Sequence, residues 1–488
     1  MDENIQKCAS TKSYYIKEKE DKLHNKYYVF YVNKNISLSK KMLKEMEKYN
    51  YVKFNYKFNR LVDDLPSNIQ YIKFGSYFNQ SVDNLPKNLK ELHFGEYFNE
   101  PIDNLPKGLK VISFGNRFDQ ALNDKLPAGL ESITFADKFN KQIDYLPEGL
   151  ISLTFGGDFN QPVDNLPTFN PERGINGLQN LTFGIMFNQS VDNLPTGLKS
   201  LDFAGKYVAG QFNQPVDNLP DFNPEKGING LENLIFGNSF NQPVDKLPKN
   251  LKNLKFGDKF NQPVDNLPSG LLNLTFGNEY NYNKILNLQT TAYLPSVNGN
   301  FNKSVDNLPK GLKSIKFGYS FNQSIDNLPL GLKELYLGYS FNQSVDNLPQ
   351  EIELLIFGNN FNKSVDNLPT FNPKSGKNGL QKLIFGNEFN KSVDNLPDGL
   401  ISIKFGHYFN QPVNNLPTKL ENLTFGNNFN QPLDNLPSGL KNLTLGYMFN
   451  HELNNLPLGL ESLIINPKYD KPLNHISKLV KISRIHFY

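Results

Sequence analysis

The side chains that most often carry out catalysis or bind metal ions are few in this chain, and the sequence does not group them. No histidine has metal-ligand spacing to another histidine or to the single cysteine, Cys8, and nothing near Cys8 would activate its thiol. The histidines are His24, His93, His407, His451, His475 and His486. A Gly-rich phosphate loop is also missing. We therefore expect no enzymatic activity, no metal and no other cofactor.

A regularly spaced series of aspartates is the strongest candidate for a cation site. Its members are Asp83, Asp103, Asp144, Asp164, Asp192, Asp217, Asp245 and Asp265. If they stack about 5 Å apart, like charges repel by roughly 0.8 kcal/mol per pair in water. The column is tolerable if each carboxylate accepts hydrogen bonds from turn N–H groups. A Ca²⁺-binding column is the alternative, but each period supplies one carboxylate, and Asn414 and Asn454 replace it. We favour the structural interpretation.

These aspartates belong to a repeat that accounts for most of the chain. Phe240 and Phe260 stand twenty residues apart, and each position between them has a counterpart one period later. A repeat of this length must be read before any single residue, because each copy is one structural unit. We therefore treat the chain as an array of about twenty coils of twenty residues.

One coil has the apolar spacing of a short strand. Leu254 and Phe256 stand two apart, Gly257 follows, and Asn, Asp and Pro fill much of the remainder. The apolar spacing i, i+3, i+4, i+7 of a helix is absent from the coil. A single coil cannot offset its ordering entropy, so neighbouring coils must stack and pair their strands. The fold class we expect is a mainly β repeat solenoid with one long parallel sheet.

The asparagine that follows the second Phe of each coil is expected to form a ladder. Stacked side-chain amides can satisfy turn backbone groups in the adjacent coil. We interpret this column as structural rather than ligand-binding. Its members include Asn59, Asn79, Asn99, Asn140, Asn160 and Asn188.

The full unit, F-N-x-[PS]-[VIL]-[DN]-x-L-P-x-x-[LI]-x-x-[LI]-x-[FL]-G, is similar to the FNIP repeat of slime-mould and giant amoebal-virus proteins, and it recurs nearly twenty times. Its L-P-x-x-L-x-x-L-x-[FL] part resembles the short leucine-rich repeats of bacterial effectors. Here Asn directly follows Phe, unlike in ordinary leucine-rich repeats, so the turn geometry should differ. The resemblance implies an interaction module and supplies no catalytic residue.

Charge and cysteine content limit the classes of partner. Residues 1–57 carry thirteen Lys and seven acidic residues, a charge of +6, and the remaining 38 basic and 41 acidic residues give −3. We therefore expect neither nucleic-acid nor membrane binding. One cysteine excludes a disulfide framework, and the first fifteen residues have no apolar signal-peptide core. We expect an intracellular, cytoplasmic monomer.

Four segments follow from where the repeat begins and ends. Residues 1–25 are rich in Lys and Glu, and we expect a disordered leader. Residues 26–57 contain a strand at Lys26–Val32 and a helix capped at Ser37 or Ser39, which we interpret as an amino-terminal cap. The array spans residues 58–465, with one irregular coil at 281–300. Residues 466–488 are expected to form a carboxyl-terminal cap, partly helical.

Three coils carry a nearly identical insert before the strand, at residues 168–177, 221–230 and 370–379. Loops on a rigid scaffold often bind partners. Duplication of one inserted coil explains the similarity as well, and we favour that explanation.

The outward positions of the strands change character between Ser314 and Lys404. Elsewhere they are mostly Ser, Asn, Thr or Lys, but here adjacent coils align apolar residues in what we expect to be an exposed column. An apolar patch bordered by charge is typical of a protein contact, whereas β propensity alone is an equally good explanation. The candidate partner-binding residues are Lys316, Glu334, Tyr336, Leu354, Ile356, Lys382, Ile384 and Lys404.

The function that these observations favour is a non-catalytic scaffold that binds one or more proteins through the sheet. One alternative is a ubiquitin-ligase substrate adaptor, in which the amino-terminal segment recruits the ligase. A second is a glycan-binding solenoid, which the lack of Trp weakens and the expected exposure of Tyr319, Tyr339 and Tyr447 favours.

Overall fold

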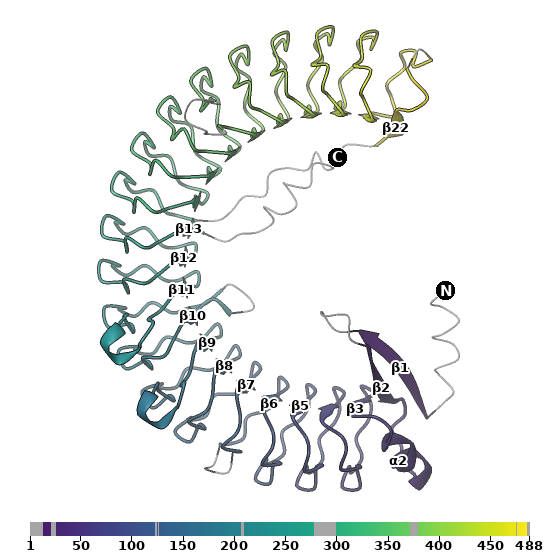
Figure 1. Ribbon diagram of the computed structural model, residues 1–488, viewed down its shortest axis with the longest axis vertical. Helices are drawn as coiled ribbons and strands as arrows, with labels where there is room; N and C mark the ends of the chain where they lie inside the picture. The colour runs from purple at the N-terminus through teal and green to yellow at the C-terminus, as the bar shows by residue number, and fades with distance from the viewer. Residues whose placement is uncertain are drawn as a thin grey trace. The chain divides into compact units, whose positions relative to one another are not determined.

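The computed structural model describes residues 13–20, 26–122, 124, 126–205, 209–277, 299–370, 379–474 and 476–485. The chain divides into two compact units, Met1–Gly237 and Asn238–Tyr488. Within each unit, short strands lie side by side and are joined by returns of turns and extended backbone (Figure 1). The mainly β repeat solenoid expected from the sequence is confirmed.

The first unit contains one long series of strands and the helix α2 (Lys40–Met46). β1 pairs antiparallel with β2, and each later neighbouring pair is parallel. The strands are β1 (Tyr14–Glu20), β2 (Lys26–Val32), β3 (Tyr51–Phe54), β4 (Tyr71–Lys73), β5 (Glu91–His93), β6 (Val111–Ser113), β7 (Ser132–Thr134), β8 (Ser152–Thr154), β9 (Asn180–Thr182), β10 (Ser200–Asp202) and β11 (Asn233–Ile235).

The second unit is a parallel series throughout its described strands. These strands are β12 (Asn253–Phe256), β13 (Asn273–Phe276), β14 (Ser314–Lys316), β15 (Glu334–Tyr336), β16 (Leu354–Ile356), β17 (Lys382–Ile384), β18 (Ser402–Lys404), β19 (Asn422–Thr424), β20 (Asn442–Thr444), β21 (Ser462–Ile465) and β22 (Lys481–Arg484).

Each strand is short because only its central residue and the following Phe or Leu must reach the core. In β12, Leu254 is 2% exposed and Phe256 is fully buried. Lys255, between them, points to the opposite face, as strand alternation requires. Leu254 pairs with Leu274 of β13, so identical positions of successive coils stand side by side.

Two columns of phenylalanine rings fill the core. The ring of Phe256 stacks on that of Phe260 in its own coil, with centroids 3.7 Å apart, and lies 5.6 Å from Phe276 in the next coil. Each ring therefore touches others within and between coils, which adds aromatic contact energy to the area buried.

The glycine after the strand is required because successive coils approach each other closely. A Cβ at Gly95 would lie only 2.0 Å from the carbonyl oxygen of Gly75, the equivalent residue of the preceding coil. No side chain fits at that distance, so the recurring F-G pair sets the spacing between turns.

The predicted asparagine ladder is confirmed. Asn59 Oδ1 accepts a hydrogen bond from the backbone N–H of Asn79 at 3.0 Å, and Asn79 Oδ1 accepts from that of Asn99 at 2.7 Å. Asp119 takes one place in the ladder: its N–H donates to Asn99, and its Oδ1 accepts from the N–H of Asn140. An oxygen acceptor at this position is therefore the essential feature.

The amino end corrects the expectation of a leader disordered over residues 1–25. Residues 14–20 form β1, because the ring of Tyr14 stacks on Phe30 and that of Tyr15 on Tyr31, each pair with centroids 4.7 Å apart. Residues 1–12 and 21–25 lie outside the described part of the chain.

The next segment has the strand and the helix where the sequence predicts them. The hydroxyl of Ser39 accepts a hydrogen bond from the Met42 N–H at 3.3 Å, and Met42 and Met46 are buried. The role of residues 26–57 as a cap stays a prediction.

The carboxyl end corrects the expectation of a partly helical cap. Lys481–Arg484 form strand β22, which pairs in parallel with β21. The turn before it follows the repeat: the Val480 N–H donates to the Ser477 carbonyl, as the Leu440 N–H donates to that of Pro437. The apolar residues from Leu473 to Ile485, which recur every three positions, therefore belong to a degenerate last coil rather than to a helix.

The inserts leave strand pairing intact. In the first, η1 (Pro171–Arg173) is a 3-10 turn capped by the side chain of Asn170, and in the second, η3 (Pro224–Lys226) is capped in the same way by Asn223. Residues 371–378 of the third insert and most of the irregular coil predicted at 281–300 lie outside the described residues. β13 pairs directly with β14 across that interruption.

Candidate functional site

Two stretches of the outward sheet face stand out chemically. The first, here called the β14–β18 face, consists of the eight residues predicted from the sequence. Strand register aligns Lys316, Tyr336, Ile356, Ile384 and Lys404 in one row. The predicted alignment of apolar residues on adjacent strands is therefore correct.

The predicted exposure of this row is wrong. Tyr336 is 4% exposed, Ile356 2% and Ile384 4%, and together with Leu354 they form one buried cluster. Part of the reason is that in-register side chains on neighbouring strands pack against each other. The ammonium of Lys316 also lies 4.9 Å from the Tyr336 ring centroid. The apolar centre of this face therefore contributes to stability.

Charged groups border the cluster. Glu334 Oε2 accepts hydrogen bonds from the Ser314 hydroxyl at 3.1 Å and from the Tyr336 hydroxyl at 3.4 Å. Lys382 is exposed, whereas Lys404 is buried, and burial lowers the pKa of its ammonium. Contact with a partner on this face would start from Lys382 and the half-buried Lys316 and Glu334.

The second stretch lies in the first unit and is here called the β1–β4 face. Register aligns Tyr15, Tyr31, Lys53 and Lys73 in one row. The neighbouring row contains Tyr51 and Tyr71. The face is more open than the β14–β18 face, because Lys73 is exposed and the other five residues are half-buried.

Aromatic rings hold the first lysine of this face between them. The rings of Tyr15 and Tyr31 are stacked 4.7 Å apart with an interplanar angle of 3°. The ammonium of Lys53 lies 6.0 Å from the ring centroids of both Tyr31 and Tyr71, within reach of cation–π attraction.

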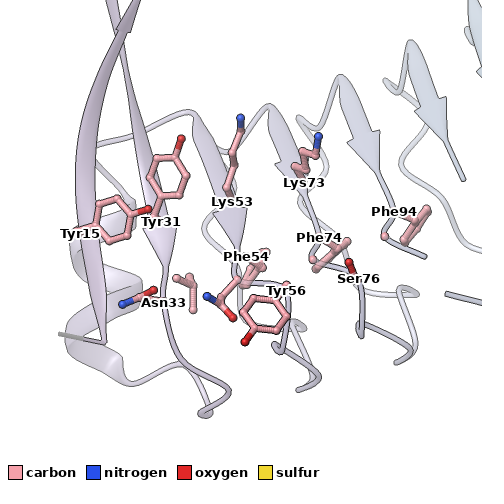
Figure 2. Close-up of a pocket in the computed structure, with 14 residues that line it drawn as sticks. Tyr15, Tyr31, Asn33, Lys53, Phe54, Tyr56, Lys73, Phe74, Ser76 and Phe94 are labelled. Atoms are coloured by element: carbon pink, nitrogen blue, oxygen red, sulfur yellow. The ribbon is translucent and has the colours of Figure 1, made fainter. Parts of the chain in front are cut away.

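A cavity of about 430 Å³ opens beside these residues. Lys53 and Lys73 extend from neighbouring strands on the same side, with Tyr31 beside Lys53 and Tyr15 beyond Tyr31 (Figure 2). Polar and aromatic side chains and glycine backbone contribute to its wall. The lining includes Tyr15, Tyr31, Asn33, Lys53, Asn55, Tyr56, Lys73, Gly75, Ser76 and Gly95.

Burial and repulsion change the protonation of this face. Burial raises the pKa of Tyr71 to about 12. The pKa of Lys53 is lowered, first by burial and then by the positive charges of Lys73 and Lys19. The pKa of His93 is also lowered by burial, although Glu91 opposes the change. Each of these groups therefore favours its uncharged form more than it would in water.

Sequence reasoning missed the β1–β4 face. The motifs Y-V-K-F at 51–54 and Y-I-K-F at 71–74 could have indicated it, because each places Tyr at the first outward position of the strand and Lys at the second. The strand that adds Tyr15 is not part of any repeat, so its contribution required the structure.

The aspartate column has structural partners, but the donors are side chains rather than the turn N–H groups considered from the sequence. Asp83 Oδ1 accepts a hydrogen bond from the side-chain amide of Asn104 in the next coil at 3.0 Å, and its Oδ2 accepts from the Ser81 hydroxyl at 2.8 Å. Bonds of this kind lower the pKa of Asp306 and Asp346. Among the described residues, no group of three or more His, Cys, Asp or Glu could hold a metal ion.

A search for membrane spans within the described ranges finds no helix that is long and apolar enough to cross a membrane.

Of the similar solved structures, one supports the fold. One similar structure is "The crystal structure of CroV588 a novel circular LRR protein structure", which is 33% identical with a TM-score of 0.64, over 90% of this chain and 73% of that chain. Another is YopM from Yersinia enterocolitica WA-314, 17% identical with a TM-score of 0.37, over 91% of this chain and 93% of that chain. Comparison with curated proteins finds no match.

A family model gives the clearest assignment. The model described as FNIP Repeat matches ten segments, most of which overlap a neighbour: 54–97, 81–117, 98–138, 118–158, 243–279, 301–340, 321–360, 392–428, 409–448 and 429–468. Merged, they cover 54–158, 243–279, 301–360 and 392–468, which is more than half of the 488 residues. With its parallel sheet of twenty-residue coils, this chain belongs to the FNIP repeat family.

Proposed function

We propose that this protein is a non-catalytic scaffold that binds one or more proteins through the outward face of its strands. The observation that carries the proposal is the contrast between the two sides of each strand. Inward positions repeat the same Leu, Ile and Phe from coil to coil, whereas outward positions change from Tyr and Lys in β3 and β4 to Ser and Thr in β7 and β8. Variable chemistry on a constant frame suits protein recognition.

In the described residues of the amino-terminal segment, 13–20 and 26–57, nothing favours the ligase-adaptor alternative over the scaffold. β2 pairs with β3, and α2 buries Met42 and Met46, so much of this segment contributes to the fold. A glycan-binding role has one specific observation in its favour: Tyr319 is 39% exposed and stacks on Tyr339 with ring centroids 4.6 Å apart. Glycan-array binding that disappears in a Tyr319→Ala, Tyr339→Ala variant would support that second candidate.

The scaffold proposal is tested by photocrosslinking with the full chain. A photoreactive amino acid is placed at the outward position Thr134, or at the exposed turn residues Lys107 and Lys310 as matched controls. Each protein is incubated with lysate from its natural source and irradiated, and crosslinked proteins are identified by mass spectrometry. We expect a partner to be recovered from Thr134 and not from the turns. Crosslinks confined to the turns, or none, would contradict binding through the sheet.

A further inference from the structure

We infer that the β1–β4 face binds an acidic segment of a partner protein, with a carboxylate held between Lys53 and Lys73 and a neighbouring side chain in the adjacent cavity. This inference rests on the proposed scaffold function and specifies the chemistry of one contact.

The first observation is a pair of cations placed side by side. Lys53 and Lys73 are direct register partners on adjacent parallel strands, whose separation is about 4.8 Å. Their mutual repulsion contributes to the lowered pKa of Lys53. A bound carboxylate would relieve that repulsion and contact both ammonium groups.

The second observation is how lysines elsewhere in the coils are arranged. Lys110 pairs with Glu131 and Lys138 with Asp158, each at 2.8 Å and each across neighbouring coils. In the part of the chain that the structure describes, no ion pair joins Lys53 or Lys73 to a carboxylate. A carboxylate supplied by a partner can therefore pair with these two lysines, as Glu131 and Asp158 pair with lysines elsewhere.

The third observation is the preorganised wall. The rings of Tyr31 and Tyr71 lie near the ammonium of Lys53 and limit its positions, and Tyr15 stacks on Tyr31. Tyrosine rings offer large contact area at a low cost in conformational entropy. The cavity of about 430 Å³ lies within the range that binds small ligands or side chains, and it combines polar groups with the edges of core rings such as Phe74.

Local charge favours a short acidic segment over a nucleic acid. Positive charge on this face comes from Lys19, Lys53 and Lys73, while Glu91 lies on the next strand. The basic surplus is concentrated in residues 1–57, which carry a charge of +6, while residues 58–488 carry −3 and do not extend the basic patch along the sheet as a long polyanion would need.

The experiment measures fluorescence anisotropy of a short labelled peptide rich in Glu and Asp with one central Phe, added to the full chain. We expect binding that weakens with added salt and that falls by roughly tenfold or more in Lys53→Gln, Lys73→Gln, where two charge contacts are lost. The matched control Lys107→Gln, Lys310→Gln removes two exposed turn lysines and should bind like the parent. A Lys53→Arg, Lys73→Arg variant should retain most of the binding.

Four results would overturn the inference: no binding of the peptide, equal binding of its Gln and Asn analogue, equal loss in the control variant, or equally tight binding of a single-stranded oligonucleotide. Circular dichroism of the Gln variant shows whether a loss reflects unfolding, and the Arg variant provides a second check. If the peptide fails while the partner found by photocrosslinking still binds the Lys53→Gln, Lys73→Gln variant, the acidic-segment inference fails and the scaffold function stands.

Discussion

The β1–β4 face and the β14–β18 face are both built on neighbouring strands of the repeat sheet, but their outward side chains have different roles. Both place a lysine ammonium near a tyrosine ring, at 6.0 Å for Lys53 and Tyr31 and at 4.9 Å for Lys316 and Tyr336. The row then continues with exposed Lys73 in the first case and with buried Ile356 in the second. Outward positions can therefore provide either a charged, accessible surface or additional core.

The comparison assumes that the cores of the two units are equivalent. Truncating one phenylalanine in each unit tests this assumption. Phe183 and Phe256 are both fully buried, and each stacks 3.7 Å from a second Phe of its coil. We expect Phe183→Ala and Phe256→Ala each to cost about 3–5 kcal/mol, because each leaves a cavity. Hydrogen exchange of the backbone amides in the same coil measures the free energy of local unfolding. Costs that differ widely between the two would show that the coils are not equivalent.

A charge inserted into each face should sharpen the contrast. Ile356→Asp is expected to destabilise its unit by about 3 kcal/mol, because the carboxylate would be buried among apolar side chains. Lys73→Asp, at an exposed outward position, should change the free energy of unfolding by less than about 0.5 kcal/mol. Denaturant unfolding followed by circular dichroism measures both. A neutral Ile356→Asp would mean that the cluster is open to water.

The asparagine ladder should contribute equally to the stability of both units, independent of the outward side chains on the neighbouring strands. Asn160 Oδ1 accepts from the Asn188 N–H at 2.9 Å, and Asn322 Oδ1 accepts from the Asn342 N–H at 2.8 Å. Replacing either Asn by Ala should cost about 1–2 kcal/mol, because a part-buried N–H loses its acceptor. Asn160→Asp should be tolerated, since Asp119 already accepts in the ladder. Thermal unfolding of the three variants checks this, and a destabilising Asn160→Asp would show that the amide itself is needed.

Repetition explains which features could be predicted from the sequence. Leu254, Phe256 and the asparagines recur at fixed positions, so one coil determines the environment of all of them. The burial of Ile356 was not predictable, because outward exposure depends on what surrounds the strand. β1 was missed for a related reason: its stability comes from pairing with β2 and stacking on Phe30, and no periodic pattern records those contacts.

A small pH dependence is expected in the coil around β5 of the first unit. Burial lowers the pKa of His93 in the folded chain, so the unfolded chain binds a proton first as the pH falls below about 6.5. The stability of the coil around β5 is therefore complete above that pH and decreases as the pH falls toward the lower, folded pKa. The loss should stay below about 1 kcal/mol, since the ring is partly exposed. Hydrogen exchange at β5 should show a smaller change between pH 7.5 and 5.5 in His93→Gln than in the parent, and an unchanged difference would exclude His93 as the titrating group.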